Sequence, residues 1–110
     1  MRETEIAMER SSGNVYADLG FRDAAEMLVK AQLVAKIGEI LTARKWTQQQ
    51  ASKILGIPQP KLSKMLRGQF RGISEAKMME CLTRLGCDIQ IIIGRERVTS
   101  TVGSVEVVSA

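Results

Sequence analysis

Two short amphipathic segments joined by a glycine-centred turn are the feature that most restricts the fold of this chain. Residues 47–55 begin with Thr47 and Gln50, whose spacing is that of a capping box. They end before Gly56, the residue type that adopts a left-handed backbone at least cost. A second segment begins near Gln59 and carries aliphatic side chains at i, i+3 and i+4. This order predicts a hairpin of two short helices.

Patterns on both sides of this hairpin supply the rest of a helical domain. A long segment from Arg22 to about Arg44 repeats apolar residues every three or four positions, and a shorter one runs from Ser74 to Gly86. Residues 87–93 instead alternate between apolar and polar side chains, which is typical of a β-strand. We therefore expect a mainly all-α fold, a bundle of four to five helices with a C-terminal β-strand used for dimerisation.

The expected strand needs a partner, because one strand alone cannot satisfy its backbone hydrogen-bonding groups. The same strand of a second copy, antiparallel across a two-fold axis, is the most economical partner. Residues 15–17 and 105–108 of the same chain are the alternatives. The residues expected at the interface of this homodimer are Met78, Leu82, Leu85, Ile89, Ile91 and Ile93.

The length of 110 residues suits one domain with arms. We expect a flexible arm over residues 1–21, the helical domain with its strand over residues 22–94, and a tail over residues 95–110. No apolar run reaches the roughly 18 residues that a membrane span needs. The first residues are polar and acidic, unlike a secretory signal peptide, and this favours a cytoplasmic location.

Basic residues are concentrated in the centre of the chain. The net charge is +4, yet residues 36–72 hold eight basic residues and one acidic residue, Glu39, while both flanking thirds are net negative. A basic centre of this kind is expected of a protein that binds phosphate groups. A solvated basic face is the alternative interpretation.

The chemistry of the side chains argues against an enzyme. The chain has no histidine, and its two cysteines, Cys81 and Cys87, lie in apolar company that suits buried free thiols. It has no glycine-rich phosphate loop and no motif of paired carboxylates. We therefore expect no catalytic residue, no metal and no cofactor. The few aromatic residues also argue against stacking on single-stranded RNA.

The stretch from Trp46 to Gly68 resembles the helix-turn-helix of the phage-repressor family, of Cro and Xre type. The matching elements are Thr47-Gln48, Ala51, Leu55-Gly56-Ile57, Gln59, Leu62-Ser63 and Gly68. Pro58 departs from the pattern, since a side chain that caps the next helix is usual there. The stretches 11–20 and 85–89 look like those of the HigA-like antitoxin branch. The resemblance implies a lambda-repressor-like fold.

The same resemblance implies a function. A protein of this kind would be a dimeric, sequence-specific transcriptional regulator on a palindromic DNA operator, and in the HigA-like branch an antitoxin that represses its own operon. Its further partner would be a RelE-like toxin protein, for which residues 1–20 are a candidate binding segment. A stand-alone phage-type repressor and a protein-interaction module are the alternatives.

The resemblance also implies which residues contact DNA. Gln59 would form hydrogen bonds with the edge of an adenine, and Gln48 would hydrogen-bond a phosphate and brace Gln59. Pro60 would touch a thymine methyl group, and Lys64 would pair with guanine. The candidates for base contacts are Gln59, Pro60, Lys61, Ser63 and Lys64. The candidates for phosphate contacts, which set the position on DNA rather than the sequence, are Gln48, Lys53, Arg67 and Arg71.

Overall fold

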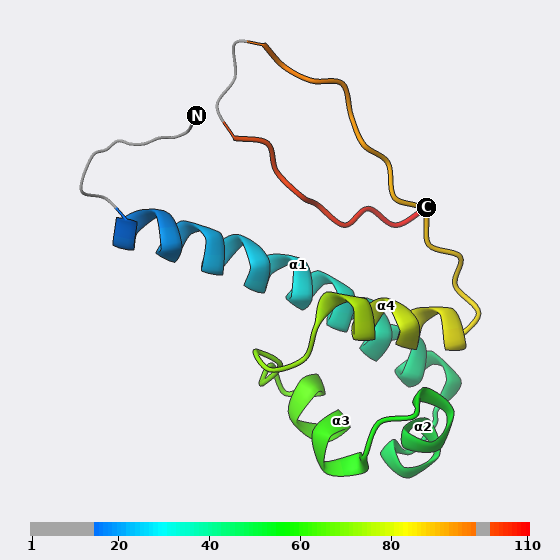
Figure 1. Cartoon of the computed structure of the whole chain (residues 1–110). Coiled ribbons are helices and arrows are strands. Elements are labelled where there is room, and N and C mark those ends of the chain that lie inside the picture. Colours follow the sequence, from blue (N-terminus) through cyan, green and yellow to red (C-terminus); the bar gives the residue numbers. More distant parts are fainter. Residues whose placement is uncertain (1–14, 99–101) are drawn as a thin grey trace.

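The computed structural model describes residues 15–98 and 102–110, with side chains from Asp23 onward, and its regular elements are four α-helices (Figure 1). The helices are α1 (Val15–Arg44), α2 (Gln48–Leu55), α3 (Gln59–Leu66) and α4 (Glu75–Arg84). The expectation of a mainly helical domain is therefore confirmed, with four helices.

The first helix is longer than the apolar pattern predicted. It begins at Val15 rather than near Arg22, so residues 15–21, expected in the arm, are helical, while the rest of the expected arm lies outside the described residues. Extension of α1 toward its N-terminus costs little free energy. Each residue added to a helix that is already packed gains a hydrogen bond without a new nucleation step. No helix in the described part of the chain is long and apolar enough to cross a membrane.

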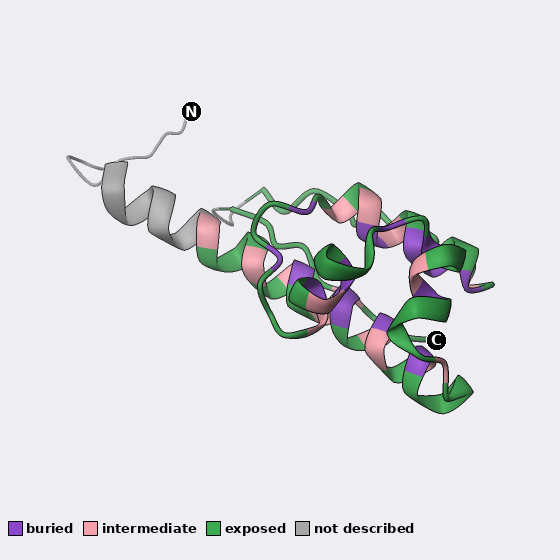
Figure 2. Ribbon diagram, turned by 90° about the horizontal axis from the view of Figure 1, so that it is seen from below, coloured by how far each residue is buried: buried purple, intermediate pink, exposed green. Residues whose placement is uncertain are grey.

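One hydrophobic core holds the four helices together. The second half of α1 packs against α3 and α4, and α2 packs against α3 and α4, so that the buried residues of all four helices face one another (Figure 2). In Figure 1 the first half of α1 extends past the other helices. The largest side chains that are completely buried are Ile37, Leu55, Leu62, Met65, Met78 and Cys81.

The C-terminal β-strand predicted over residues 87–93 is not seen. This segment is extended, but nothing in the described residues pairs with it and it forms no strand. The physical reason is that a strand exists only through the hydrogen bonds of a partner strand, and the described residues of the chain offer none here. The later side chains of the segment lie in solvent, with exposed fractions of 76% for Ile91 and 89% for Ile93.

The end of the chain returns to α1. The backbone N–H of Val107 donates to Gln32 Oε1 at 3.3 Å, and the Val107 side chain packs against the edge of the core. Residues 105–108 therefore contact a helix and form no ladder with residues 87–93.

Candidate nucleic-acid interface

The start of α2 is fixed by the capping box that the sequence predicted. The Gln50 N–H donates to Thr47 Oγ1 at 3.1 Å, and the Thr47 N–H donates to Gln50 Oε1 at 2.9 Å. Ala51 and Leu55 are completely buried on the inner side of the helix. Gln48 at its N-terminal end is left exposed, as a residue that bonds a phosphate must be.

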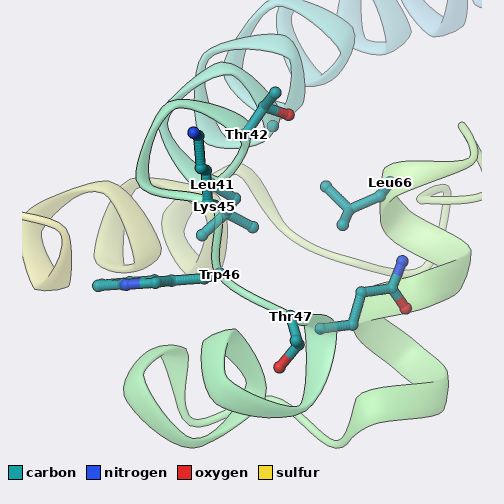
Figure 3. A pocket seen from close by; sticks show the side chains of 8 residues that line it. Leu41, Thr42, Lys45, Trp46, Thr47 and Leu66 are labelled. Atoms are coloured by element: carbon teal, nitrogen blue, oxygen red, sulfur yellow. The ribbon is translucent and has the colours of Figure 1, made fainter.

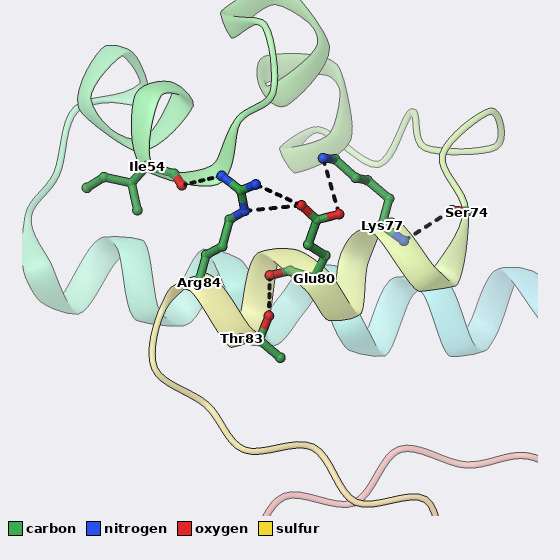
Figure 4. Close-up of polar contacts among 6 residues, drawn as sticks. All are labelled: Ile54, Ser74, Lys77, Glu80, Thr83 and Arg84. Atoms are coloured by element: carbon green, nitrogen blue, oxygen red, sulfur yellow. Dashed lines mark hydrogen bonds and ion pairs between the residues drawn. The ribbon is translucent and has the colours of Figure 1, made fainter.

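The turn between α2 and α3 depends on Gly56 and is braced by α4. Gly56 has a φ of 68°, in the left-handed region that glycine tolerates best. Arg84 of α4 donates from Nη1 to the Ile54 carbonyl at 3.3 Å, and Glu80 holds the same guanidinium at 3.0 Å (Figure 4). A charged donor on the last carbonyls of α2 stabilises its C-terminus. The orientation of α3 is thus linked to α4.

The third helix has a buried inner side and a polar outer side. Leu62 and Met65 are completely buried, and they anchor α3 to the core. The N-cap residue Pro58 makes no side-chain hydrogen bond, in keeping with its departure from the family pattern. The predicted base-reading residues are all on the outer side: Gln59, Pro60, Lys61 and Lys64 are exposed and Ser63 is half-buried.

The surface around α3 carries positive charge with little to neutralise it. No aspartate or glutamate occurs between residues 40 and 74. In the part of the chain that the structure describes, Lys53, Lys61, Lys64 and Arg67 form no ion pair. Arg67 donates from Nη1 to Ser63 Oγ at 3.2 Å, which keeps its guanidinium beside α3. Within the described residues, the positive charge of these four side chains is therefore not neutralised by an acidic partner.

Arg71 differs from the other predicted phosphate residues. It lies in the loop between α3 and α4, and its Nη1 is 2.6 Å from Asp23 Oδ1 on α1. The hydrogen bond to Asp23 and its charge raise the pKa of the Arg71 guanidinium, with a smaller contribution from Glu26. This ion pair could not be predicted from local sequence patterns, because the two residues are 48 positions apart.

A pocket lies where the end of α1, the start of α2 and the end of α3 meet (Figure 3). Lys45, Trp46 and Gln48 line it together with Leu66. Lys45 is exposed and has a φ of 57° at the corner between the two helices. Lys45 and Gln48 thus line the same pocket, and Lys45 was not predicted as a site residue from the sequence although it belongs to the basic centre.

The six residues predicted for the dimer interface fall into two groups. Met78, Leu82 and Leu85 are at most 5% exposed and belong to the core of their own chain. Ile89, Ile91 and Ile93 lie beyond α4, and the last two are largely exposed. Of these six residues, only the isoleucines offer apolar surface to a partner.

The cysteines are free thiols, as expected. Cys81 is buried and Cys87 is half-buried. Burial raises the pKa of the Cys81 thiol, because the charged thiolate is poorly solvated in the core. Among the described residues, no three side chains of the metal-binding types come together.

The short α2, the glycine turn and the exposed α3 together define a helix-turn-helix protein. A family model described as "Helix-turn-helix domain" matches residues 15–94, and the chain belongs to this family. The chain is also similar to a solved structure described as "Putative XRE Family Transcriptional Regulator", with a TM-score of 0.73 and 28% identity over 80% of this chain and 99% of that chain. A search of curated proteins gives no match.

Proposed function

We propose that this chain is a sequence-specific DNA-binding transcriptional regulator that inserts α3 into the major groove. The observation that carries the proposal is the two-sided α3, with Leu62 and Met65 in the core and its polar and cationic residues in solvent. The major groove, about 12 Å wide, admits an α-helix and presents a distinct pattern of donors and acceptors for each base pair. The family and the described neighbour support the same function.

In this proposal the residues of α3 read bases and the residues around it hold phosphates. The Gln59 amide offers a donor and an acceptor side by side, which suits adenine, and the Lys64 ammonium suits guanine. Pro60, Lys61 and Ser63 complete the base-reading set. The phosphate contacts come from Gln48, Lys53, Arg67 and Arg71, to which the structure adds Lys45 as a candidate.

We propose further that the regulator is a homodimer on a palindromic operator. The support is the exposed, extended isoleucine segment of residues 89–93, which has no backbone partner among the described residues of one copy. Pairing of this segment with its copy across a two-fold axis would satisfy both backbones and cover the isoleucines. Two α3 helices would then face successive major grooves, about one helical turn apart.

DNA selected by the protein from a random duplex pool tests this function. A palindromic consensus is expected, and Gln59→Ala and Lys64→Ala should each weaken binding by about 1–3 kcal/mol per half-site and relax selectivity at one base pair of each half-site. Lys77→Ala on α4, whose ammonium is paired with Glu80 at 3.5 Å, is the matched control and should bind as the parent does. Unchanged affinity and selectivity in both α3 variants would contradict the assignment of the reading helix.

The likeness to the HigA-like branch extends the proposal to an antitoxin that represses its own operon and binds a RelE-like toxin. The test is to look for a small reading frame next to the gene of this chain: its product should arrest growth when expressed alone, and co-expression of this chain should restore growth. Residues 1–14, part of the candidate toxin-binding segment, lie outside the described residues. A harmless neighbour that does not bind this chain would instead favour a stand-alone phage-type repressor.

A further inference from the structure

We propose that Arg71 exchanges its carboxylate partner on α1 for a DNA phosphate, so that Asp23 restrains the affinity of the chain for DNA. This inference rests on the proposed function and adds a residue, Asp23, that lies outside the helix-turn-helix. Arg71 lies in the loop between α3 and α4, within the acid-free stretch of residues 40–74. Its guanidinium is nevertheless held 2.6 Å from Asp23 on the protruding half of α1.

The backbone around Arg71 is anchored independently of its side chain. The buried Lys30 of α1 donates from Nζ to the Arg71 carbonyl at 3.0 Å and pairs with Glu26 at 3.3 Å. Phe70 and Ile73 on either side are buried in the core, 9% and 5% exposed. The loop can therefore keep its position while the Arg71 side chain changes partners.

The ion pair itself is weak enough to be exchanged. The side chains of Arg71 and Asp23 are 71% and 47% exposed, so water and salt screen their attraction. A phosphate offers the same guanidinium a bidentate acceptor and releases a condensed counterion from the DNA. Docking on DNA would then break the contact with Asp23, and the cost of breaking it lowers the affinity that Arg71 can provide.

Thermodynamic linkage makes the coupling between DNA binding and the Arg71–Asp23 contact reciprocal. If DNA binding releases Asp23 from Arg71, then any change that neutralises Asp23 raises DNA affinity by the same coupling factor. The Asp23 carboxylate would thus connect the protruding half of α1 with the DNA-binding loop.

A double-mutant cycle of Asp23→Asn and Arg71→Ala on a random-sequence duplex of about 30 base pairs tests the proposal, because phosphate contacts do not depend on sequence. Fluorescence anisotropy would be measured over a range of salt concentrations. Arg71→Ala should weaken binding and reduce the slope of log K against log salt by about 0.9 for each protomer bound. Asp23→Asn should tighten binding about two- to fivefold with Arg71 present, and should have no such effect in the Arg71→Ala background.

Glu39→Gln is the matched control, since it removes one negative charge from α1 at a carboxylate that is paired with Lys36. It should leave binding close to that of the parent, and thermal unfolding should show all variants folded. The proposal is overturned if Arg71→Ala changes neither affinity nor slope, if Asp23→Asn acts equally in both backgrounds, or if Asp23→Asn weakens binding. A parent that binds no DNA at all would overturn the proposed function as well.

Discussion

Single side chains decide where the helices of this protein begin and end. Thr47 and Gln50 satisfy each other's backbone groups at the start of α2, and Ser74 accepts a hydrogen bond from the Lys77 N–H at the start of α4. Both caps could be predicted from the sequence, because capping depends on residues only three positions apart. The hydrogen bond that Arg44 donates to the Leu85 carbonyl at 2.7 Å could not be predicted, because the two residues are 41 positions apart.

Removal of the first cap should destabilise the domain. Thr47→Ala is expected to lower the free energy of unfolding by about 1 kcal/mol, because the Gln50 N–H loses its acceptor at the start of α2. Thr42→Ala, at an exposed position of α1, is the control and should stay within about 0.5 kcal/mol of the parent. Urea unfolding measures both, and equal stability of the two variants would argue against the cap.

The Cys81 thiol should make stability depend on alkaline pH. Burial raises its pKa in the folded state, so its stabilising contribution is complete below the ordinary thiol pKa and is lost as pH rises through the folded value. The free energy of unfolding of the parent should therefore fall between pH 7 and about pH 9.5 by more than that of Cys81→Ala. Parallel pH profiles would show that Cys81 does not carry this dependence.

At the level of the elements, the helix-turn-helix was the part best predicted from the sequence. Its caps, its turn and its buried aliphatics all follow from local spacing, and α2 and α3 are found where the pattern placed them. The early start of α1 at Val15 was missed, because helix extension there follows from attachment to a packed helix rather than from a periodic pattern. The bracing of the turn by Arg84 was missed because it joins two separate helices.

Gly56 should be the least replaceable residue of the turn. A Cβ at this position would lie 2.9 Å from Arg84 Nη1, and its φ of 68° disfavours any other residue type. Gly56→Ala is expected to cost about 1–2 kcal/mol from the backbone alone, with a further loss from the displaced guanidinium. In the Arg84→Ala background only the backbone part should remain. Thermal unfolding should therefore show a larger loss of stability for Gly56→Ala with Arg84 present than without it, and equal losses would contradict the crowding by Arg84.

At the scale of the whole molecule, the structure of one chain does not test the predicted pairing of residues 87–93 with a second copy. The alternation over residues 87–93 is a real property of the sequence, but the hydrogen bonds that define a strand must come from elsewhere. The contacts of the chain end with α1 and of Arg71 with Asp23 were also beyond sequence reasoning, since they join residues 75 and 48 positions apart.

The homodimer is testable at this scale. Ile91→Lys and Ile93→Lys should each shift the protein from dimer to monomer in sedimentation experiments, because a charge placed in the proposed pairing surface is poorly solvated there. Val98→Lys, equally exposed but outside the expected strand, is the control and should remain dimeric. A parent that sediments as a monomer, or variants that remain dimers, would argue against pairing through this segment.

The position of Trp46 gives the protein a built-in optical probe. It is the chain's single tryptophan, half-buried at the corner between α1 and α2, with the Arg44 guanidinium 4.9 Å from the centre of its ring. Indole emission responds to a nearby charge and to water, so its intensity should change when the helix-turn-helix loosens or when a nucleic acid approaches the Gln48 edge. Folding and binding of this protein are therefore open to measurement without any attached dye.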